Sequence, residues 1–599
     1  MAETMKERKD MDPQYMWDLS TLFKNDEEWN NALPELDEMI KKLPEYQGKL
    51  NNAKTIREFF DFDTHLGRKL SDFYCYASLR NCEDTRDSEA QAMEAKAYQV
   101  YTAYATAISF AEPEILSLDE DVLETIVHSE DLKPYAFNMQ KLLDQKPHVL
   151  SAKEEALLAA FTETLGAPSK ISESLQDADM TFESVTDSNG EIHELNQSNY
   201  ILLQMSEDRT LRLNAFKSFY KGFKQHINTF AATYNGCIKE AVAEAQVRHY
   251  ESSRAMSMAY EHVPGVVYDS LVDTVRKFMP EMYRYVRLRK QILGLDELHY
   301  YDVYTPLIAG SSKSYTYEEA QQMVLDAVTP LGEDYVNRVK QAYKDRWIDV
   351  YPNNGKRGGA FSSGTYDSNP YILTSFTGTL DSVSTIAHEM GHSQHTWLSN
   401  HTQTPQNADY TLFVAEVAST VNENLLVEQL LQKTTEPKER LALLNHYLEG
   451  FKGTVYRQTM FAEFERDAHA MAERGEAITS ASMNTLYKNL IKDYFGEDLV
   501  IDDEVQYEWA RIPHFYRPFY VYKYATSYCA AVALSEAILN NEEGAVKRYL
   551  EFLSMGGSAY PLDELKHAGV DFSTPEPVSR ALTKFSQILD DVEETLKKL

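Results

Sequence analysis

The chain has 599 residues, of which 43% are hydrophobic, enough apolar material for a large buried core. Its 93 acidic residues outnumber its 59 basic residues, which gives a net charge of −34 at pH 7. A surface of that charge repels nucleic acid and anionic lipid, so the composition argues against partners of either kind.

The cysteines and the N-terminal residues indicate the cellular compartment of the protein. Its four cysteines, Cys75, Cys82, Cys237 and Cys529, are too sparse for a disulfide framework, and the first pair is expected to pack in a core. The first nineteen residues contain no apolar run that resembles a secretion signal. No stretch of about 18 apolar residues could span a membrane. We therefore expect a soluble, cytoplasmic enzyme with no membrane partner.

Helical periodicity dominates the sequence, with apolar residues recurring three or four positions apart. The segments with this pattern are 14–110, 152–176, 206–250, 265–292, 316–346, 407–431, 437–474, 517–541 and 577–597. Within the first region, residues 85–112 lack Gly and Pro and are followed by Pro113. Tyr98 and Tyr101 lie on one face of this helix. The sequence predicts a mainly α-helical body.

A β-hairpin is predicted at residues 181–195, because Asn189-Gly190 is a turn pair flanked by residues that tolerate strands. A new series of helical segments begins directly after it. We therefore expect an N-terminal helical domain at residues 1–200 and a second domain at residues 201–599, which contains the motif described below.

A second region with strand character runs from residue 356 to residue 376, and its apolar centre is Tyr371-Ile372-Leu373. Gly358 and Gly359 permit another backbone to approach closely. The region is either an edge strand that pairs with a substrate backbone or an ordinary Gly-rich loop.

Residues 388–392 read His-Glu-Met-Gly-His, inside a helix expected from about 380 to 399. Two histidines four positions apart share one helical face, so His388 and His392 can reach one metal ion. Glu389 lies beside the first ligand and can take a proton from a water held by the metal. This is the zincin signature, and it predicts a zinc site.

A third ligand is expected from the next helix, residues 413–431. Glu416 is flanked there by apolar residues, where a carboxylate is costly unless a cation compensates it. The metzincin spacing is absent, because this chain has His395 and Leu398 where that pattern has Gly and His. We interpret His395 as a packing residue, and Glu416 as the ligand that leaves one position open for water.

Two further carboxylates have open assignments. Glu423 lies seven residues after Glu416 on the same face, and either orients a ligand histidine or replaces Glu416 as the ligand. Asp381, seven residues before His388, is a second candidate for orienting that histidine. Each is alternatively a solvated helix residue.

A stripe of polar aromatic residues occurs near the C-terminal end. It contains His514, Tyr516, Tyr520, Tyr522 and Tyr524 within eleven residues. In a chain with 39 tyrosines such a stripe is most often part of a core. Tyr and His are nevertheless good hydrogen-bond donors to a developing oxyanion. Both interpretations stay open on the residues alone.

Several of these segments together resemble oligoendopeptidase F, a group within the thimet-oligopeptidase family of zinc peptidases. The most specific pair is DSVSTIAHEMGHSQH (381–395) followed by FVAEVASTVNE (413–423). Supporting segments are YMWDLSTLF (15–23), LHYYDVYTPL (298–307), GKRGGAF and NPYILTSFTGT (within 355–379), ARIPHFYRPFYVYKYATS (510–527) and GGSAYPLDELKHAGVD (556–571). The resemblance covers nearly the whole chain.

The resemblance implies a mainly α, two-lobed zincin of the gluzincin type, with a deep substrate channel and a small β-sheet near the active site. Such proteins admit short peptides and exclude folded ones. Glu416 matches the family's third zinc ligand. His514 and Tyr524 match a histidine and a tyrosine that face the scissile carbonyl, and Tyr516 and Tyr520 compete for a further tyrosine role.

We therefore expect a zinc-dependent oligoendopeptidase that binds one Zn²⁺ per chain and hydrolyses internal bonds of short peptides. One alternative is a cytoplasmic zinc carboxypeptidase with the same motif. Another is a non-catalytic, zinc-containing peptide-binding protein, although a structural zinc site has no need of Glu389. The sequence is compatible with a monomer or a homodimer.

Overall fold

The computed structural model describes residues 5–308 and 313–599, and most of them are helical. They form two compact units, each built from three stretches of sequence. Unit 1 comprises the described residues of Met1–Val149, Lys313–Gln429 and Leu534–Val570. Unit 2 comprises those of Leu150–Ser312, Leu430–Ala533 and Asp571–Leu599. The predominance of helix agrees with the periodicity of the sequence.

The two units differ from the linear division at residue 200, because helices that pack together are far apart in the sequence. Two unit boundaries fall inside continuous helices, α17 (Leu412–Lys433) and α21 (Tyr522–Leu539). A search for linkers could not detect such boundaries, because an uninterrupted helix carries no turn or loop signal.

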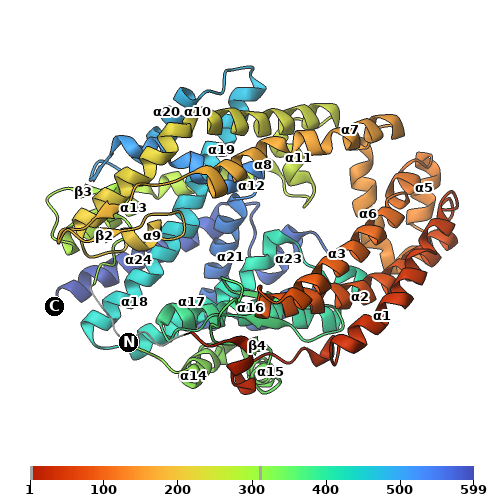
Figure 1. The fold of residues 1–599 in the computed structure, drawn as a ribbon, viewed down its shortest axis with the longest axis horizontal. Coiled ribbons are helices and arrows are strands. Elements are labelled where there is room, and N and C mark those ends of the chain that lie inside the picture. Colours follow the sequence, from red (N-terminus) through yellow and green to blue (C-terminus); the bar gives the residue numbers. More distant parts are fainter. Residues whose placement is uncertain (1–4, 309–312) are drawn as a thin grey trace. The chain divides into compact units, whose positions relative to one another are not determined.

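Unit 1 begins with three long helices that lie side by side (Figure 1). They are α1 (Asp26–Ile40), α2 (Ala53–Glu83) and α3 (Ser88–Ile108). The side chains of Asn25, Asn52 and Asp87 accept backbone N–H groups of the first turns and so fix where the helices start. Trp29 of α1 stacks on Phe73 of α2, with 4.3 Å between ring centroids.

The face of α3 that packs inward consists of small and flexible residues, Ala90, Met93, Ala97 and Val100. Tyr98 is 61% exposed and Tyr101 is 50% exposed, so the tyrosine face predicted from the sequence lies outward. The helix ends at Ile108, before Pro113, which lies in the short helix α4 (Ala111–Leu116). On α2, Cys75 and Cys82 are buried, which confirms their packing role.

A three-stranded sheet follows in unit 1, with the order β4 (Ile348–Asp349), β6 (Tyr371–Leu373) and β5 (Phe361–Ser363). Strand β6 runs parallel to β4 and antiparallel to β5, with Ile348 and Phe361 opposite Ile372 and Leu373, respectively. The predicted apolar strand is therefore confirmed as the buried centre of the sheet. Strand β5 lies at its edge.

The remaining helices of unit 1 pack on one another and on the elements already described. They are α5 (Glu120–Val127), α6 (Ala136–Gln145), α14 (Tyr317–Ala327), α15 (Glu333–Lys344), α16 (Leu380–Thr402), the first part of α17, α22 (Ala545–Leu553) and α23 (Pro561–Ala568). Helix α16 contacts both β5 and β6.

Unit 2 is organised around α10 (Arg209–Val247), which buries residues along its whole length. The other helices are α7 (Ala152–Leu165), α8 (Ala167–Ser174), α9 (Tyr200–Gln204), α11 (Ser253–Ala259), α12 (Gly265–Lys277), α13 (Met279–Ile292), α18 (Pro437–Gly450), α19 (Arg457–Glu473), α20 (Ser480–Phe495), most of α21, and α24 (Glu576–Leu596). Helix α10 runs beside α8, α19 and α20 (Figure 1).

The strands of unit 2 are short. The predicted hairpin is confirmed as β1 (Val185–Thr186) and β2 (Ile192–His193), with Gly190 at a positive φ in its turn. A parallel pair consists of β3 (Leu298–His299) and β7 (Leu499–Val500).

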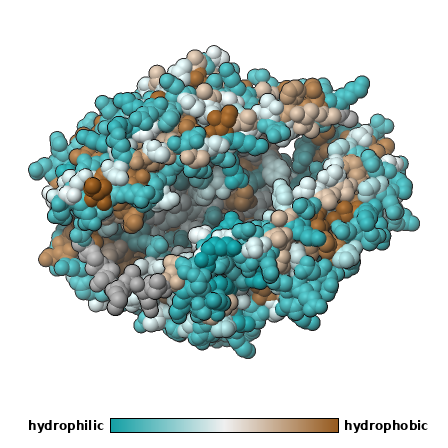
Figure 2. All heavy atoms as spheres, viewed as in Figure 1, coloured by the Kyte–Doolittle hydropathy of each residue, from teal (hydrophilic) through white to brown (hydrophobic). Residues whose placement is uncertain are grey.

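On the face drawn in Figure 2, hydrophilic residues predominate and hydrophobic ones form small, scattered groups. Among the described residues, none of the helices combines the length and the apolar character that crossing a membrane requires.

Candidate metal centre and catalytic residues

Helix α16 carries the His-Glu-Met-Gly-His motif and begins at a well-defined cap. The hydroxyl of Thr379 accepts a hydrogen bond from the Ser382 N–H at 3.1 Å. Asp381 lies in the first turn, where a carboxylate interacts favourably with the helix dipole. The helix extends to Thr402, three residues beyond its predicted end.

Helices α16 and α17 approach each other closely at Gly391, in the middle of the motif. A Cβ atom there would lie 2.6 Å from Ala418 O and from Ser419 Cα. Only glycine fits this crossing. Asn422 of α17 also donates to Ala387 O of α16 at 3.0 Å. These contacts bring Glu416 opposite the two motif histidines.

Three ligand-type atoms converge between the two helices. Nε2 of His388 and Nε2 of His392 are 3.2 Å apart, and each lies 3.4 Å from Oε2 of Glu416. Bonds of about 2.0–2.1 Å at tetrahedral angles would separate zinc ligands by about 3.3 Å. Lone pairs of two imidazoles and a carboxylate oxygen repel one another at such distances unless a cation or a proton lies among them. The residues therefore fit a metal ion.

The electrostatics of this group favour positive charge. Burial opposes a charged imidazole at His388, but the hydrogen bond and charge of Glu423 and the nearby carboxylates raise its pKa to about 9. Burial also opposes ionisation of Glu416, but His392 and His388 lower its pKa to about 2. Glu389 is 6% exposed, and burial raises its pKa against the opposing effect of the two histidines.

Glu423 lies beside the opposite nitrogen of the first histidine. Its Oε1 is 3.2 Å from Nδ1 of His388, so a proton on Nδ1 would leave the Nε2 lone pair free for a metal. The structure thus places Glu416, not Glu423, in the three-atom group. Asp381 is exposed, and its backbone carbonyl accepts from Thr385.

His395 lies away from the three-atom group. Its ring stacks on Tyr410 with 3.7 Å between centroids and also contacts Phe552. The residue is 1% exposed, and burial, assisted by His392, lowers its pKa to about 3. This environment is that of a packing residue.

Two residues that connect the elements of this site were not predicted from the sequence. Asn422 is fully buried and also accepts from the hydroxyl of Tyr335 at 3.2 Å. Ser393, directly after His392, lies 2.8 Å from the hydroxyl of Ser362 on β5. Asn422 lies between Val421 and the polar pair Glu423-Asn424, so it lacks the apolar flanks that identified Glu416 and leaves no comparable signal in the sequence.

In unit 2, the predicted aromatic stripe includes a compact cluster. The rings of His514 and Tyr520 are nearly parallel at 6.2 Å, and Tyr524 lies edge-on to both, at 6.0 and 5.3 Å. The hydroxyl of Tyr524 donates to that of Tyr520 at 3.3 Å. Burial and then Arg517 lower the pKa of His514.

Tyr516 does not belong to this cluster, although the sequence treats it as an alternative to Tyr520. It follows His514 on a 3₁₀ turn (Pro513–Tyr516), and its hydroxyl lies 2.7 Å from that of Thr233 on α10. Tyr522 is also separate, being fully buried against Tyr268. Because a 3₁₀ turn has three residues per turn, side chains two positions apart point in different directions.

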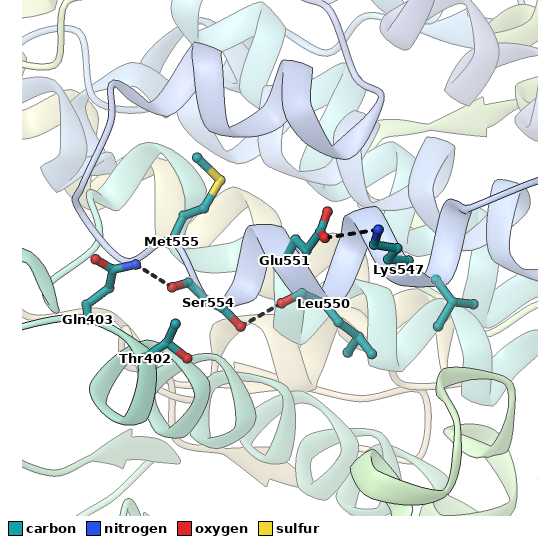
Figure 3. A pocket seen from close by; sticks show the side chains of 8 residues that line it. Thr402, Gln403, Lys547, Leu550, Glu551, Ser554 and Met555 are labelled. Atoms are coloured by element: carbon teal, nitrogen blue, oxygen red, sulfur yellow. Dashed lines mark hydrogen bonds and ion pairs between the residues drawn. The ribbon is translucent and has the colours of Figure 1, made fainter.

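Two other features of the described residues lie outside these clusters. Asp187, Glu191 and His193 gather at the β1–β2 hairpin, but Oδ1 of Asp187 already accepts the N–H groups of Asn189 and Glu191. An apolar surface pocket of about 810 Å³ lies at the end of α16 and along α22 (Figure 3). Its wall includes a hydrogen bond from Gln403 to Ser554 O, and none of the predicted site residues lines it.

Comparison with known proteins gives matches along the whole chain. Two family models match: Peptidase family M3 over residues 202–584 and Oligopeptidase F over residues 114–182. Oligopeptidase PepF of Bacillus subtilis is 44% identical over 100% of this chain and 90% of its own length. Group B oligopeptidase PepB of Streptococcus agalactiae is 40% identical over 99% of this chain and 98% of its own.

Solved structures of peptidases also match nearly the whole chain. A chain from Chlamydophila abortus described as a peptidase has a TM-score of 0.93 at 35% identity, and covers 99% of this chain and 100% of itself. Oligoendopeptidase-F from Enterococcus faecium has a TM-score of 0.75 at 36% identity, and covers 96% of this chain and 100% of itself.

Proposed function

The chain belongs to peptidase family M3 and is a metalloendopeptidase of the oligoendopeptidase type, and on this premise we propose that its metal is zinc and its substrates are short peptides. The observation that carries the proposal is the convergence of two imidazole nitrogens and one carboxylate oxygen within 3.2–3.4 Å of one another. We propose His388, His392 and Glu416 as the ligands of one zinc ion.

When bound, zinc supplies Lewis acidity, which polarises the scissile carbonyl and makes a water molecule more acidic. Glu389 is proposed to remove a proton from that water and then to donate it to the leaving amine. Its position beside His388 and its burial, which raises its pKa, support this role.

We propose His514, Tyr520 and Tyr524 as hydrogen-bond donors to the oxyanion that forms on the scissile carbonyl. The family resemblance of residues 510–527 supports this assignment, and so does the mutual contact of the three side chains. Strand β5 is proposed to pair with the substrate backbone, because it lies at a sheet edge and contacts α16 through Ser362.

The experiment that tests the proposal is mass spectrometry of a short peptide blocked at both ends, digested with and without a chelator. We expect cleavage at internal bonds, loss of cleavage with the chelator and recovery on addition of zinc. An exopeptidase would leave the blocked peptide intact, and chelator-resistant cleavage would exclude a metal mechanism. Either result would overturn the proposal.

A further inference from the structure

The segment that carries the proposed oxyanion donors contains a backbone corner at Phe519. This residue has a φ of 57°, in the left-handed region that residues with a bulky side chain rarely adopt. Such a conformation persists only where the surrounding structure holds it. Tyr520 follows directly, so the dihedral angles at Phe519 set the direction in which Tyr520 leaves the backbone.

Helix α19 provides two side chains that hold the corner. Oε1 of Glu465 accepts the N–H of Phe519 at 2.8 Å, and Glu465 is 0% exposed. His469, four residues later on the same helical face, packs its ring against the ring of Phe519 at 4.7 Å. The backbone and the side chain of Phe519 are thus both fixed from one helix.

Two further helices of unit 2 complete the support. The hydroxyl of Ser257 on α11 donates to Pro518 O at 2.9 Å. Tyr268 on α12 lies edge-on to the ring of Phe519 at 6.0 Å, and its own hydroxyl donates to Ala462 O on α19. Contacts from three helices therefore converge on two consecutive residues, Pro518 and Phe519.

We propose that Glu465 is a positioning residue for peptide hydrolysis, because its acceptance of the Phe519 N–H fixes the corner from which His514, Tyr520 and Tyr524 act as donors. The inference rests on the proposed function of these donors. Glu465 itself touches no proposed reacting group; it acts through the backbone. Without the hydrogen bond from the Phe519 N–H to Glu465, the backbone before Tyr520 would no longer be fixed, and neither would the contact between Tyr520 and Tyr524.

The environment of Glu465 predicts which substitutions it tolerates. Its Oε2 is buried and has no hydrogen-bond partner among the described residues, and burial raises its pKa well above the ordinary value. Glutamine has the same length and the same carbonyl acceptor, whereas leucine has no acceptor and aspartate is one methylene too short to reach Phe519.

The first test compares Glu465→Leu, Glu465→Asp and Glu465→Gln in the zinc-loaded enzyme with an end-blocked peptide. We expect kcat to fall by about 10–100-fold for the leucine variant and by less for the aspartate variant, with KM and zinc content little changed. The glutamine variant should retain kcat within about threefold. If the leucine variant does not fold, the aspartate variant still tests the proposal.

The matched control is Glu463→Leu on the same helix. Glu463 is also buried, but it accepts from Arg276 and Tyr494 rather than from the corner. Its loss should lower stability and leave the kcat of the folded enzyme unchanged. An equal fall in kcat for the Glu463 and Glu465 variants would reduce Glu465 to a general packing role and overturn the proposal.

A second measurement is independent of activity. Hydrogen exchange of the backbone across residues 515–521 should accelerate in Glu465→Leu and stay slow in Glu465→Gln, because the Phe519 N–H loses or keeps its acceptor. Unchanged exchange in the leucine variant would overturn the proposal. A double variant, Glu465→Leu with Tyr520→Phe, gives a further test. If its loss of kcat equals the product of the two single losses, the two residues act independently and the proposal is overturned.

The two proposals fail in distinguishable ways. If His514→Ala, Tyr520→Phe and Tyr524→Phe all leave kcat unchanged, the donor assignment is wrong and the role of Glu465 falls with it. If these variants lower kcat but Glu465→Leu does not, the donor assignment stands and only the positioning role is overturned.

Discussion

The carboxylates between α16 and α17 and the carboxylate of Glu508 in unit 2 have very different neighbours, and the side chain of Glu416 is 38% exposed whereas Glu508 is buried. Glu508 is 0% exposed and accepts from Arg457 at 2.7 Å, from Tyr300 at 2.7 Å and from Tyr487 at 2.8 Å. Although burial opposes its ionisation, Arg457 and Arg511 lower its pKa to about 2. This carboxylate has permanent cations from its own chain.

Glu416 faces a different set of groups. Its nearest charged neighbours are the imidazoles of His388 and His392, which are cationic only when protonated. The comparison teaches how to distinguish two kinds of charged carboxylate. Where arginines and hydroxyls already satisfy a carboxylate, its role is to stabilise the fold. Where metal-type ligands converge on a carboxylate instead, we propose that the cation comes from solution.

The largest expected effect concerns Glu389, which is proposed to move a proton rather than to hold the metal. Glu389→Gln should lower kcat for an end-blocked peptide by about 10²–10⁴-fold, because the amide cannot accept the proton of water. Zinc per chain, measured by atomic emission, should stay the same. His388→Ala should lose both zinc and activity. Near-normal cleavage by the glutamine variant would show that Glu389 is not the base.

On the other side of the comparison, Glu508→Leu should destabilise the fold by about 3–5 kcal/mol, because it leaves Arg457 buried without its partner. Urea unfolding followed by circular dichroism measures the change. The control is Asp503→Ala, which removes an exposed partner of Lys488 and should barely move the transition. Equal effects of the two variants would contradict the distinction drawn here.

The acid sensitivity of unit 2 gives a sharper test of the same carboxylate. Its folded-state pKa of about 2 lies below the ordinary value of 4.5, so its stabilisation is complete above pH 4.5 and is lost as the pH falls towards 2. The loss should amount to a few kcal/mol, on the order of 3. The free energy of unfolding of Glu508→Gln should change less across this range. Parallel pH curves for the two proteins would refute this assignment.

The sequence predicted the convergence of His388, His392 and Glu416 better than it predicted the Glu508 cluster, because of distances along the chain. His388 and His392 are four residues apart, so helical geometry alone brings them together. Glu416 was recognisable because a carboxylate in an apolar helix needs a partner. Tyr300 lies 208 residues from Glu508, and only the folded chain brings them together.

Directions of individual side chains were harder to predict than the existence of helices. Tyr98 and Tyr101 point outward because the inner face of α3 packs through alanine, methionine and valine. The choice between Tyr516 and Tyr520 depends on a 3₁₀ turn and on the left-handed corner at Phe519. A non-glycine residue with positive φ leaves no reliable trace in one sequence.

A smaller effect is expected at Glu423, which contacts a proposed ligand rather than the metal. Glu423→Gln should weaken zinc binding by about 10–100-fold, because the amide holds the Nδ1–H of His388 less strongly. Competition with a chelator of known affinity measures the change. Asp381→Asn is the matched control and should leave zinc affinity unchanged, since Asp381 is exposed. The interpretation fails if the control weakens zinc binding as much as Glu423→Gln does.

The smallest expected effect is at Tyr516, whose hydroxyl, like the carboxylate of Glu508, is already engaged within the fold. Tyr516→Phe removes a hydrogen bond to Thr233 and should cost about 1 kcal/mol of stability, with kcat within about twofold of the parent enzyme. Tyr520→Phe should show the reverse, a clear fall in kcat with little loss of stability. Both are measured on the same end-blocked peptide and the same urea titration. A larger loss of activity in Tyr516→Phe than in Tyr520→Phe would contradict this assignment. The hydroxyl of Tyr516 would then have to leave Thr233 during the reaction. A hydroxyl with a hydrogen-bond partner in the fold could then no longer be assigned to stability alone.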